Sequence, residues 1–248
     1  MLKISIITVT YNSEVYLQEA INSVVSQDYT NIEYIIVDGQ STDNTLTIIK
    51  QQQQLSKFIT EADSGIYDAM NKGVSLSTGE VIGLLNSDDI YTDEGVLSDV
   101  MKCFNEDPDL DVLYGNLVYV KKNDTNQIVR RWISKPYYNN FFEDGNVPPH
   151  PALFVRSRVY KEVGLFDLQY KLASDYEFMF RVLKKHNFKS KYIDRLTVKM
   201  RLGGATNKSI KNIINGNKEI LKAWKNNGLK PPLTLMIIRI LKRLVQFV

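Results

Sequence analysis

Two adjacent carboxylates follow an apolar run in the first half of the chain. The run Val81–Leu85 is typical of a buried strand, and it is followed at once by four polar residues, Asn86, Ser87, Asp88 and Asp89. Like charges side by side repel unless water, a cation or a hydrogen-bond donor offsets them. Magnesium typically binds one or two protein carboxylates together with substrate phosphates. The pattern therefore predicts either an ordinary solvated turn or a site for a metal–diphosphate.

Three more predicted strands end in polar residues. Apolar, β-branched stretches at 3–10, 32–38 and 57–61 alternate with helical patterns, which indicates crossover units and a mainly parallel sheet. Ligands bind such sheets at the carboxyl ends of the strands. We therefore expect one site at the four strand ends, namely Thr10–Asn12, Asp38–Gly39, Glu61–Asp63 and Asn86–Asp89.

Helical spacing marks the segment after the first strand. Ser13 is expected to cap a helix with an apolar face, formed by Leu17, Ala20, Ile21, Val24 and Val25. After Asp89 the pattern becomes mixed, with half-exposed strands at 111–120 and 127–133, a short strand at 151–155 and a helix at 174–186. We expect one α/β domain over 1–225, with a nucleotide-type half at 1–90 and a more mixed half at 91–225.

Composition excludes several classes of protein. The chain has 248 residues, a net charge of +3 and a single cysteine, Cys103. It lacks the clustered basic stripe with interleaved aromatic residues that nucleic-acid binding requires. One cysteine cannot form an intrachain disulfide, which fits a reducing compartment. The N-terminus has no long apolar core or cleavage site of a signal peptide, and we interpret it as the first strand.

The segment 226–248 differs from the rest of the chain. Behind Pro231 and Pro232, helical spacing places Leu233, Met236, Ile237, Ile240, Leu241 and Leu244 on one face, and Arg239, Lys242, Arg243 and Gln246 on the other. Its longest apolar run is far below the roughly 20 residues that span a bilayer. A basic amphipathic helix of this kind is typical of an in-plane membrane anchor. The alternative is a helix that packs on its own domain or on a partner subunit.

Several segments, in order, resemble the family 2 glycosyltransferases, which have the GT-A fold, a Rossmann-like domain with a central sheet. They are "ISIITVTYNSEVYLQEAINSVVSQDY", "IEYIIVDGQSTDNT", "EADSGIYDAMNKGVSLSTGEVIGLLNSDD", "HPALFVRSRVYKEVGLFD" and "ASDYEFMFRV". The resemblance extends from residue 3 to about residue 210. It implies transfer of a sugar from a nucleotide-diphosphate donor, expected to be UDP, with inversion, as in bacterial surface-polysaccharide biosynthesis.

The resemblance also implies roles for residues at the strand ends. Asn86-Ser87-Asp88 matches the Asp-any-Asp motif, so Asp88 would bind a divalent cation, Mg or Mn, with Asp89 beside it and Asn86 turned towards the ribose. Asp38 would contact the base or ribose, although Gly39 and Gln40 stand where the common pattern has Asp and Gly. The remaining donor-binding positions would be Thr10, Tyr11, Asn12, Asp63, Lys72 and Ser87.

On the acceptor side, the resemblance makes Asp175 the general base that takes the proton of the attacking hydroxyl. The segment Ser174–Glu177 also reads as a capping box, in which Asp175 merely favours the helix dipole, and the two readings are compatible. His150, between prolines, would contact acceptor or diphosphate, or else be a turn residue. Arg201 with the segment "GGATNKS" resembles a mobile loop that closes over the diphosphate, and a plain surface loop is the alternative.

We therefore expect a hexosyl- or N-acetylhexosaminyl-transferase that acts on a glycan or lipid-linked acceptor. It would be cytoplasmic and bound peripherally, through its last helix, to the inner face of the cytoplasmic membrane. A nucleotidyltransferase is one alternative, but "TVTYNSE" lacks the glycine-rich, basic loop that phosphate binding there requires. A non-catalytic nucleotide-sugar-binding module is the other, and the presence of both Asp88 and Asp175 argues against it.

Overall fold

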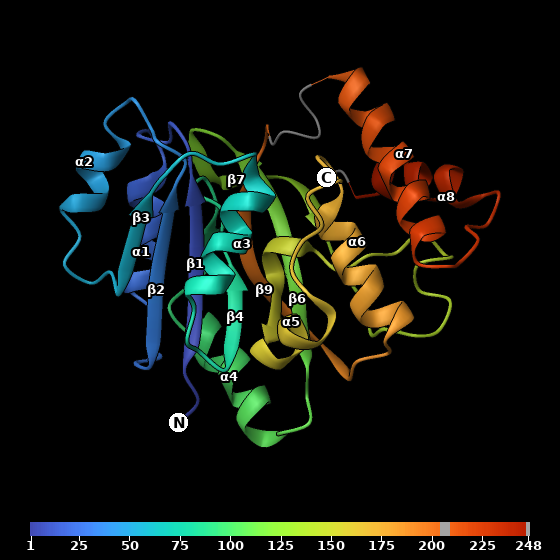
Figure 1. Ribbon diagram of the computed structural model, residues 1–248, viewed down its shortest axis with the longest axis horizontal. Coiled ribbons are helices and arrows are strands. Elements are labelled where there is room, and N and C mark those ends of the chain that lie inside the picture. Colours follow the sequence, from blue (N-terminus) through green and yellow to red (C-terminus); the bar gives the residue numbers. More distant parts are fainter. Residues whose placement is uncertain (204–208, 247–248) are drawn as a thin grey trace.

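The computed structural model describes residues 1–203 and 209–246 of the chain, which form a mixed α/β fold (Figure 1). The strands are β1 (Ile4–Thr10), β2 (Ile32–Asp38), β3 (Lys57–Thr60), β4 (Val81–Leu84), β5 (Ile90–Tyr91), β6 (Val112–Lys121), β7 (Asp124–Trp132), β8 (Leu153–Arg156) and β9 (Ser190–Arg201). The helices are α1 (Leu17–Val25), α2 (Thr45–Lys50), α3 (Ile66–Leu76), α4 (Val96–Glu106), α5 (Ser157–Val163), α6 (Ser174–Phe180), α7 (Ile210–Asn226) and α8 (Leu235–Leu244). Short helical turns cover His150–Ala152 and Arg181–Lys185.

One sheet runs through both halves, in the order β3-β2-β1-β4-β8-β6-β9-β5, and β7 pairs with β6. The strands β1 to β4 are parallel to one another, as the alternation of strands and helices predicts. The second half is mixed, because β8 enters antiparallel between β4 and β6, while β9 returns parallel to β6. The expected parallel arrangement is therefore confirmed for β1–β4 and does not extend to the whole sheet.

Helices cover both faces of the sheet, and two apolar cores result (Figure 1). Ile4 and Ile6 of β1 pack into the core that α1 and α4 complete, whereas Ile7 and Val9 pack into the core shared with α3, α5, α6 and α7. Both faces of β1 are buried, which explains why its sequence shows no alternation between apolar and charged residues. Both cores hold the carboxyl ends of β1, β2 and β4 at one edge.

The predicted cap of the first helix is wrong. Helix α1 begins at Leu17 after Tyr16, with no side-chain cap. Ser13 instead shares a hydrogen bond with Ser87, with 2.8 Å between the two hydroxyl oxygens. The Ser13 hydroxyl therefore binds a residue from another strand end instead of capping the helix, and the helix starts three residues later than expected.

The last helix packs on the domain. Leu235 of α8 is completely buried, and Met236 packs against the core that also contains Trp224. The other side of α8 stays in solvent, with Ile237 62% and Leu241 57% exposed. Within the described ranges, we find no helix with the length and apolarity needed to cross a membrane. The helix therefore has an inner face on its own domain and an apolar outer face.

A buried carboxylate ties the amino ends of the strands together, opposite the polar strand ends. Glu33 accepts hydrogen bonds from the Ser5 hydroxyl (2.6 Å), the Thr78 backbone N–H (2.7 Å) and the Lys57 ammonium (3.1 Å). Burial opposes its ionisation, but these donors outweigh burial and lower the pKa of Glu33 to about 2. The carboxylate therefore remains charged in the folded protein and links β1, β2, β3 and the α3–β4 turn.

Replacing Glu33 by Gln is expected to lower the free energy of unfolding by about 1–3 kcal/mol at neutral pH, because an amide is a weaker acceptor and brings unwanted donors. Because folding lowers the pKa of Glu33, its carboxylate contributes fully to the free energy of unfolding at pH values above the usual carboxyl pKa. This contribution is lost as the pH falls towards about 2. Urea denaturation at several pH values measures the difference. The exposed Glu106→Gln is the control and should change little; a difference for Glu33→Gln that does not shrink in acid would contradict this account.

Candidate active site

The polar strand ends meet, as the sequence predicts. The Gly39 N–H donates to the Thr10 carbonyl (2.9 Å), and the Asn12 N–H donates to the Ser41 hydroxyl (2.8 Å). Ser87, in the turn after β4, reaches the segment after β1 through Ser13. Tyr11 projects from this edge with 62% of its side chain exposed. The expected donor-binding residues of β1, β2 and β4 are therefore held in one place by hydrogen bonds between their backbones and hydroxyls.

Asp38 is completely buried and shapes its own turn. Its carboxylate accepts hydrogen bonds from the Ser41 N–H (3.0 Å), the Ser41 hydroxyl (2.5 Å) and the Thr60 hydroxyl (2.7 Å). Because both oxygens already have protein donors, the carboxylate fixes the path of residues 38–41. Direct contact of Asp38 with a base or ribose stays a prediction.

The residues that depart from the family pattern have a geometric explanation. A Cβ atom at Gly39 would lie 2.4 Å from a carboxylate oxygen of Asp63, so no side chain fits there while Asp63 holds its position. Asp63 is itself held by the Gly65 N–H, at 2.9 Å. Gln40 adopts a φ of 61°, the left-handed conformation that glycine occupies most easily. Gln40 thus has a glycine-like backbone conformation. Asp63 occupies the space that a side chain at position 39 would need.

The two adjacent carboxylates differ in burial. Asp89 is completely buried, and the Asn86 amide donates to it at 2.9 Å. Burial, together with the charge of Asp88, raises the pKa of Asp89. Asp88 remains partly exposed at the end of the turn. Asn86 is therefore turned towards Asp89 in this structure, and Asp88 is the carboxylate of the pair that solvent reaches.

Arg201 lies under this turn rather than at its surface. Only 2% of the residue is exposed, and its guanidinium donates to the Asp88 carbonyl (2.7 Å) and the Lys122 carbonyl (3.1 Å). It also pairs with Glu19 and lies 4.7 Å from the centre of the Tyr16 ring. Arg201 therefore anchors the backbone of the Asp88 turn. Residues 204–208 of the segment expected to be a mobile loop lie outside the described residues.

Lys72 is held by the acidic loop before α3. Its ammonium donates to the Ala62 carbonyl (2.6 Å) and pairs with Glu61 (3.0 Å). Although burial opposes it, the hydrogen bond to Glu61 and the charges of Asp68 and Glu61 raise the pKa of Lys72. The Lys72 ammonium thus stabilises the loop that carries Asp63 through these contacts. Contact with a phosphate stays a prediction.

Asp175 has two neighbours that are consistent with chemistry at this position. The Tyr67 hydroxyl donates to its carboxylate at 3.0 Å. Burial and the Asp175 charge raise the pKa of Tyr67, so this tyrosine remains a donor. Burial lowers the pKa of His150 while the Asp175 charge opposes that shift, which places the two residues within electrostatic range. His150 is therefore within electrostatic range of the candidate base, and its ring contacts Phe166.

The capping box expected at Ser174 is wrong. Helix α6 follows Ala173 without a side-chain cap, and the Ser174 hydroxyl donates to the Asp167 carbonyl (2.9 Å). Glu177 instead pairs with Arg181 at 3.0 Å. Asp175 is consequently oriented by its packing against α3 and not by a local cap.

Tyr119 connects the two ends of the site, and the sequence analysis did not single it out. Burial raises the pKa of Tyr119, the nearby cations Arg130 and Arg243 lower it, and the charges of Asp89 and Asp175 raise it. Its ring lies 4.4 Å from the Arg130 guanidinium. The Asp88–Asp89 turn and the candidate base are thus within electrostatic range of one buried tyrosine. Alternation along β6 marked Tyr119 only as one of many half-buried strand residues, so the sequence carried no specific signal.

Among the described residues there is no group of three or more His, Cys, Asp or Glu side chains placed to hold a metal ion. The turn offers Asp88 as a partly exposed carboxylate, with Asp89 buried beside it. A magnesium-like cation needs only one or two protein carboxylates when a diphosphate supplies further oxygens. The residues therefore fit a cation that arrives with a diphosphate, rather than a permanent protein site.

The fold joins a parallel α/β half, with polar strand ends gathered at one edge, to a mixed half that carries a further carboxylate. This arrangement is that of a glycosyltransferase of the GT-A type. The model for "Glycosyl transferase family 2" matches residues 5–164. The chain therefore belongs to glycosyltransferase family 2, as its motifs predict.

Relatives and solved structures agree with this assignment. The chain is 28% identical over 223 residues to a PGL/p-HBAD biosynthesis glycosyltransferase of Mycobacterium bovis, covering 88% of this chain and 82% of the relative. It is similar in fold to S. aureus TarS 1–349 in complex with UDP-GlcNAc (TM-score 0.69, 18% identity, 96% of this chain and 69% of that one). The mannosyltransferase PcManGT from Pyrobaculum calidifontis, in complex with GDP-Man and Mn2+, has a TM-score of 0.67, 16% identity and coverage of 96% and 68%.

Replacing Arg201 by Lys keeps the charge but removes the planar guanidinium that holds two carbonyls. We expect the free energy of unfolding to fall by about 2–4 kcal/mol, because buried acceptors lose their donors. Thermal and urea denaturation measure this loss. Arg158→Lys is the matched control, since the Arg158 side chain is 52% exposed. Equal, small effects of both substitutions would mean that Arg201 does not anchor the Asp88 turn.

Proposed function

We propose that this glycosyltransferase moves a sugar from a UDP-linked donor to a hydroxyl of a glycan or lipid-linked acceptor, with inversion at the anomeric carbon. The observation that carries the proposal is a pair of carboxylates held by the fold: Asp88, whose backbone carbonyl accepts from Arg201 at 2.7 Å, and Asp175, which accepts from the Tyr67 hydroxyl at 3.0 Å. A donor diphosphate at the first position and an acceptor hydroxyl at the second would place the reacting atoms between them. Holding two substrates in this way reduces the entropic cost of their reaction.

Asp175 acts as the general base in this proposal. A hydroxyl is a weak nucleophile until a positioned group accepts its proton. The Tyr67 hydroxyl occupies one carboxylate oxygen of Asp175 at 3.0 Å and fixes its orientation. The other oxygen is then the one to accept the proton as the acceptor oxygen bonds to the anomeric carbon and the nucleoside diphosphate leaves. His150, in electrostatic range of Asp175, lines the same region.

Asp88 would hold a divalent cation, Mg or Mn, with Asp89 supporting the turn from inside. Such a cation supplies positive charge that stabilises the departing diphosphate. Arg201 keeps the backbone of Asp88 in place by its hydrogen bond to the carbonyl (2.7 Å). The protein's own contribution is thus a rigid turn with one carboxylate that solvent reaches.

The donor is proposed to be a UDP-linked hexose or N-acetylhexosamine. Support comes from TarS, a neighbour in fold whose complex contains UDP-GlcNAc. PcManGT, another neighbour in fold, was solved with GDP-Man and Mn2+, so the donor remains to be tested directly. The exposed Tyr11 and the backbone of residues 38–41 are the groups available to the base and ribose.

Asp88→Asn and Asp175→Asn are both expected to lower kcat by about a hundred- to ten-thousand-fold, because one loses a cation ligand and the other its base. Asp175→Asn should keep donor binding, measured as thermal stabilisation by nucleotide sugars with and without Mn2+. A panel of UDP- and GDP-sugars identifies the donor in the same assay.

The exposed Asp109→Asn serves as control for these two substitutions and should retain activity. Full turnover by either site variant would refute the roles assigned above. Wild-type protein that binds a nucleotide sugar yet releases no product with any acceptor or with water would favour a non-catalytic binding module.

We also propose that the enzyme works at the cytoplasmic face of the membrane, held there by the outer face of α8. Leu233, Ile237, Ile240, Leu241 and Val245 are all more than half exposed on this helix or next to it. Exposed apolar side chains flanked by Lys and Arg are typical of helices that lie in the bilayer interface. The inner face of α8 meanwhile keeps the helix docked on the domain.

The double substitution Ile237→Gln with Leu241→Gln is expected to weaken binding to phosphatidylglycerol-containing vesicles at least about tenfold, because two apolar side chains lose their burial in lipid. Removing the whole tail is a poorer test, since Leu235 is part of the core. Val15→Gln with Val25→Gln, two exposed residues at α1, is the matched control. Unchanged flotation of the α8 variant with vesicles would refute the membrane proposal.

A further inference from the structure

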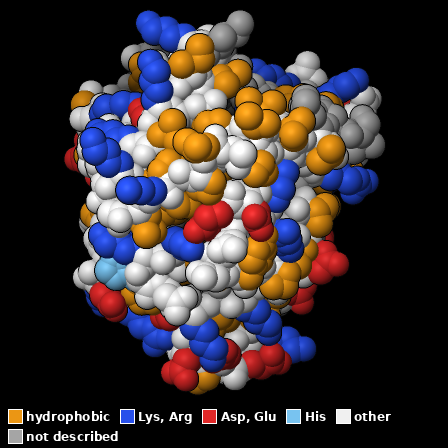
Figure 2. Space-filling model, turned by 90° about the vertical axis from the view of Figure 1, so that its right-hand side faces the viewer, with side chains coloured by type: hydrophobic (Ala, Val, Ile, Leu, Met, Phe, Trp, Pro, Cys, Tyr) orange, Lys and Arg blue, Asp and Glu red, His pale blue; other side chains and the backbone are white. Residues whose placement is uncertain are grey.

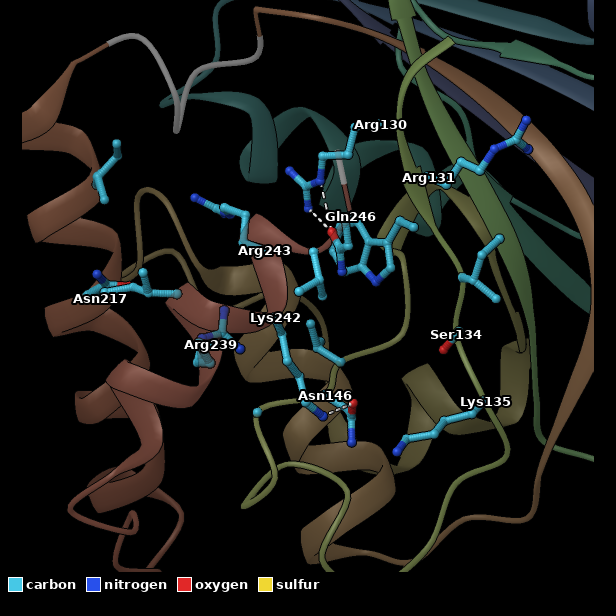
Figure 3. Close-up of a pocket in the computed structure, with 17 residues that line it drawn as sticks. Arg130, Arg131, Ser134, Lys135, Asn146, Asn217, Arg239, Lys242, Arg243 and Gln246 are labelled. Carbon is cyan, nitrogen blue, oxygen red and sulfur yellow. Dashed lines mark hydrogen bonds between the residues drawn. The ribbon is translucent and has the colours of Figure 1, made fainter. Parts of the chain in front are cut away.

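A groove of about 720 Å³ lies between β7, the segment 133–147 and the helices α7 and α8 (Figure 3). Its walls come from parts of the chain that are distant in sequence. Gln246 closes one end, because its backbone carbonyl accepts the Arg131 N–H (2.8 Å) and its side chain accepts from Arg130. The Lys242 ammonium binds Asn146 at 2.6 Å on the opposite wall. Helix α8 is thus fastened to both sides of the groove.

The groove is basic. Six of the residues that line it are cations, namely Arg130, Arg131, Lys135, Arg239, Lys242 and Arg243, and none of the described lining residues is Asp or Glu. The close-up shows Lys135 and Lys242 on facing walls, with Arg239 and Arg243 along α8 (Figure 3). Cavities lined by one sign of charge concentrate ions of the opposite sign.

Like charges lie close together inside it. Burial lowers the pKa of Lys242, and the nearby charge of Lys135 lowers it further. Burial likewise lowers the pKa of Arg130, and Arg243 adds to the shift. An anion between these groups would replace repulsion by attraction, and Arg in particular matches phosphate oxygens in geometry.

The rim of the same groove is apolar. Ile133, Ile213, Ile240 and Val245 line it, and their side chains are 56%, 36%, 55% and 83% exposed. Figure 2 shows hydrophobic side chains gathered on the side of the molecule that carries α7 and α8, with Lys and Arg beside them. Exposed apolar surface of this kind marks a binding site more often than chance. Cations and exposed apolar side chains in one groove suit a ligand with a charged head and a hydrocarbon chain.

One cation of the groove contacts α6, the helix that carries the candidate base. The Arg239 guanidinium lies 4.9 Å from the centre of the Tyr176 ring, and Tyr176 follows Asp175 in α6. Arg130 stacks on Tyr119, which is within range of both Asp175 and the Asp89 turn. The donor-side residues Asp38, Asp63 and Asp88 do not line the groove. The groove therefore adjoins α6 and is separate from these donor-side residues.

We infer that this groove binds the diphosphate of a lipid-linked acceptor, with the lipid chain leaving over the apolar rim towards the outer face of α8. The inference rests on the proposed transfer reaction, since it names the class of acceptor for that site. Charge complementarity assigns the diphosphate to the lining cations, and the exposed isoleucines assign the hydrocarbon to the rim. The sugar hydroxyl attached to the diphosphate would then face Asp175.

The test uses the full chain and flotation with phosphatidylcholine vesicles that contain a polyprenyl diphosphate. Lys242→Gln with Arg243→Gln removes two groove cations; the control, Lys218→Gln with Lys225→Gln, removes two exposed cations of α7 that do not line the groove. Each cation near a lipid phosphate strengthens binding about fivefold. We therefore expect the groove variant to bind the vesicles on the order of 30-fold more weakly than wild type, and the control variant to bind like wild type. Melting temperatures confirm that both variants are folded.

Two further arms separate the sources of phosphate. Vesicles of equal surface charge made with phosphatidylserine should bind wild type more weakly than the diphosphate vesicles do. Inorganic pyrophosphate should displace the protein poorly, because it lacks the chain that the rim would hold. Equal loss in both double variants, equal binding to phosphatidylserine, or full displacement by pyrophosphate at matched concentration would each overturn the inference.

The outcome is separable from that of the proposed function. If the protein transfers or hydrolyses a nucleotide sugar but does not prefer diphosphate vesicles, the groove inference fails and the transfer reaction stands. If Asp88→Asn and Asp175→Asn remain active while the groove variant loses binding, the site assignment fails and the groove stands.

Discussion

The candidate active site depends on one buried guanidinium. Arg201 ends β9, the longest strand of the second half, and donates to the carbonyl of Asp88 in the turn after β4. Its remaining contacts reach Lys122 after β6, Tyr16 just before α1 and Glu19 in α1. A planar group with several donors can hold acceptors from different elements at once. The position of the Asp88 turn therefore requires that the second half be folded against the first.

The two halves contribute in different ways. The donor side is rigid, because its carboxylates Asp38 and Asp89 are buried and its strand ends are joined through backbone and hydroxyl groups. The second half contributes the basic groove beside α8, which we propose as the acceptor region.

Family membership and the acceptor region are carried by different parts of the chain. The family model matches residues 5–164, which include β7 and the Asp88 turn. Asp175, Arg201 and the helices α7 and α8 lie beyond that match. The groove combines one wall from inside the matched region with another from outside it. The groove is therefore a property of the assembled structure, and it does not follow from the family match alone.

Local patterns in the sequence were sufficient to predict the α/β class and the strands β1, β2 and β4. They also predicted that polar residues gather at the ends of these strands. Such features are predictable because the burial of a strand or of a helix face determines the pattern of neighbouring residues. Local patterns did not predict β9, whose partner β6 is some 80 positions away along the chain, as in the Val112–Ser190 pair. Nor did they separate buried Asp89 from the partly exposed Asp88, because two adjacent carboxylates share the same local pattern. The caps at Ser13 and Ser174 were lost to partners from other elements. Tertiary contacts alone decided these features, since a hydrogen bond from a distant residue carries no local pattern.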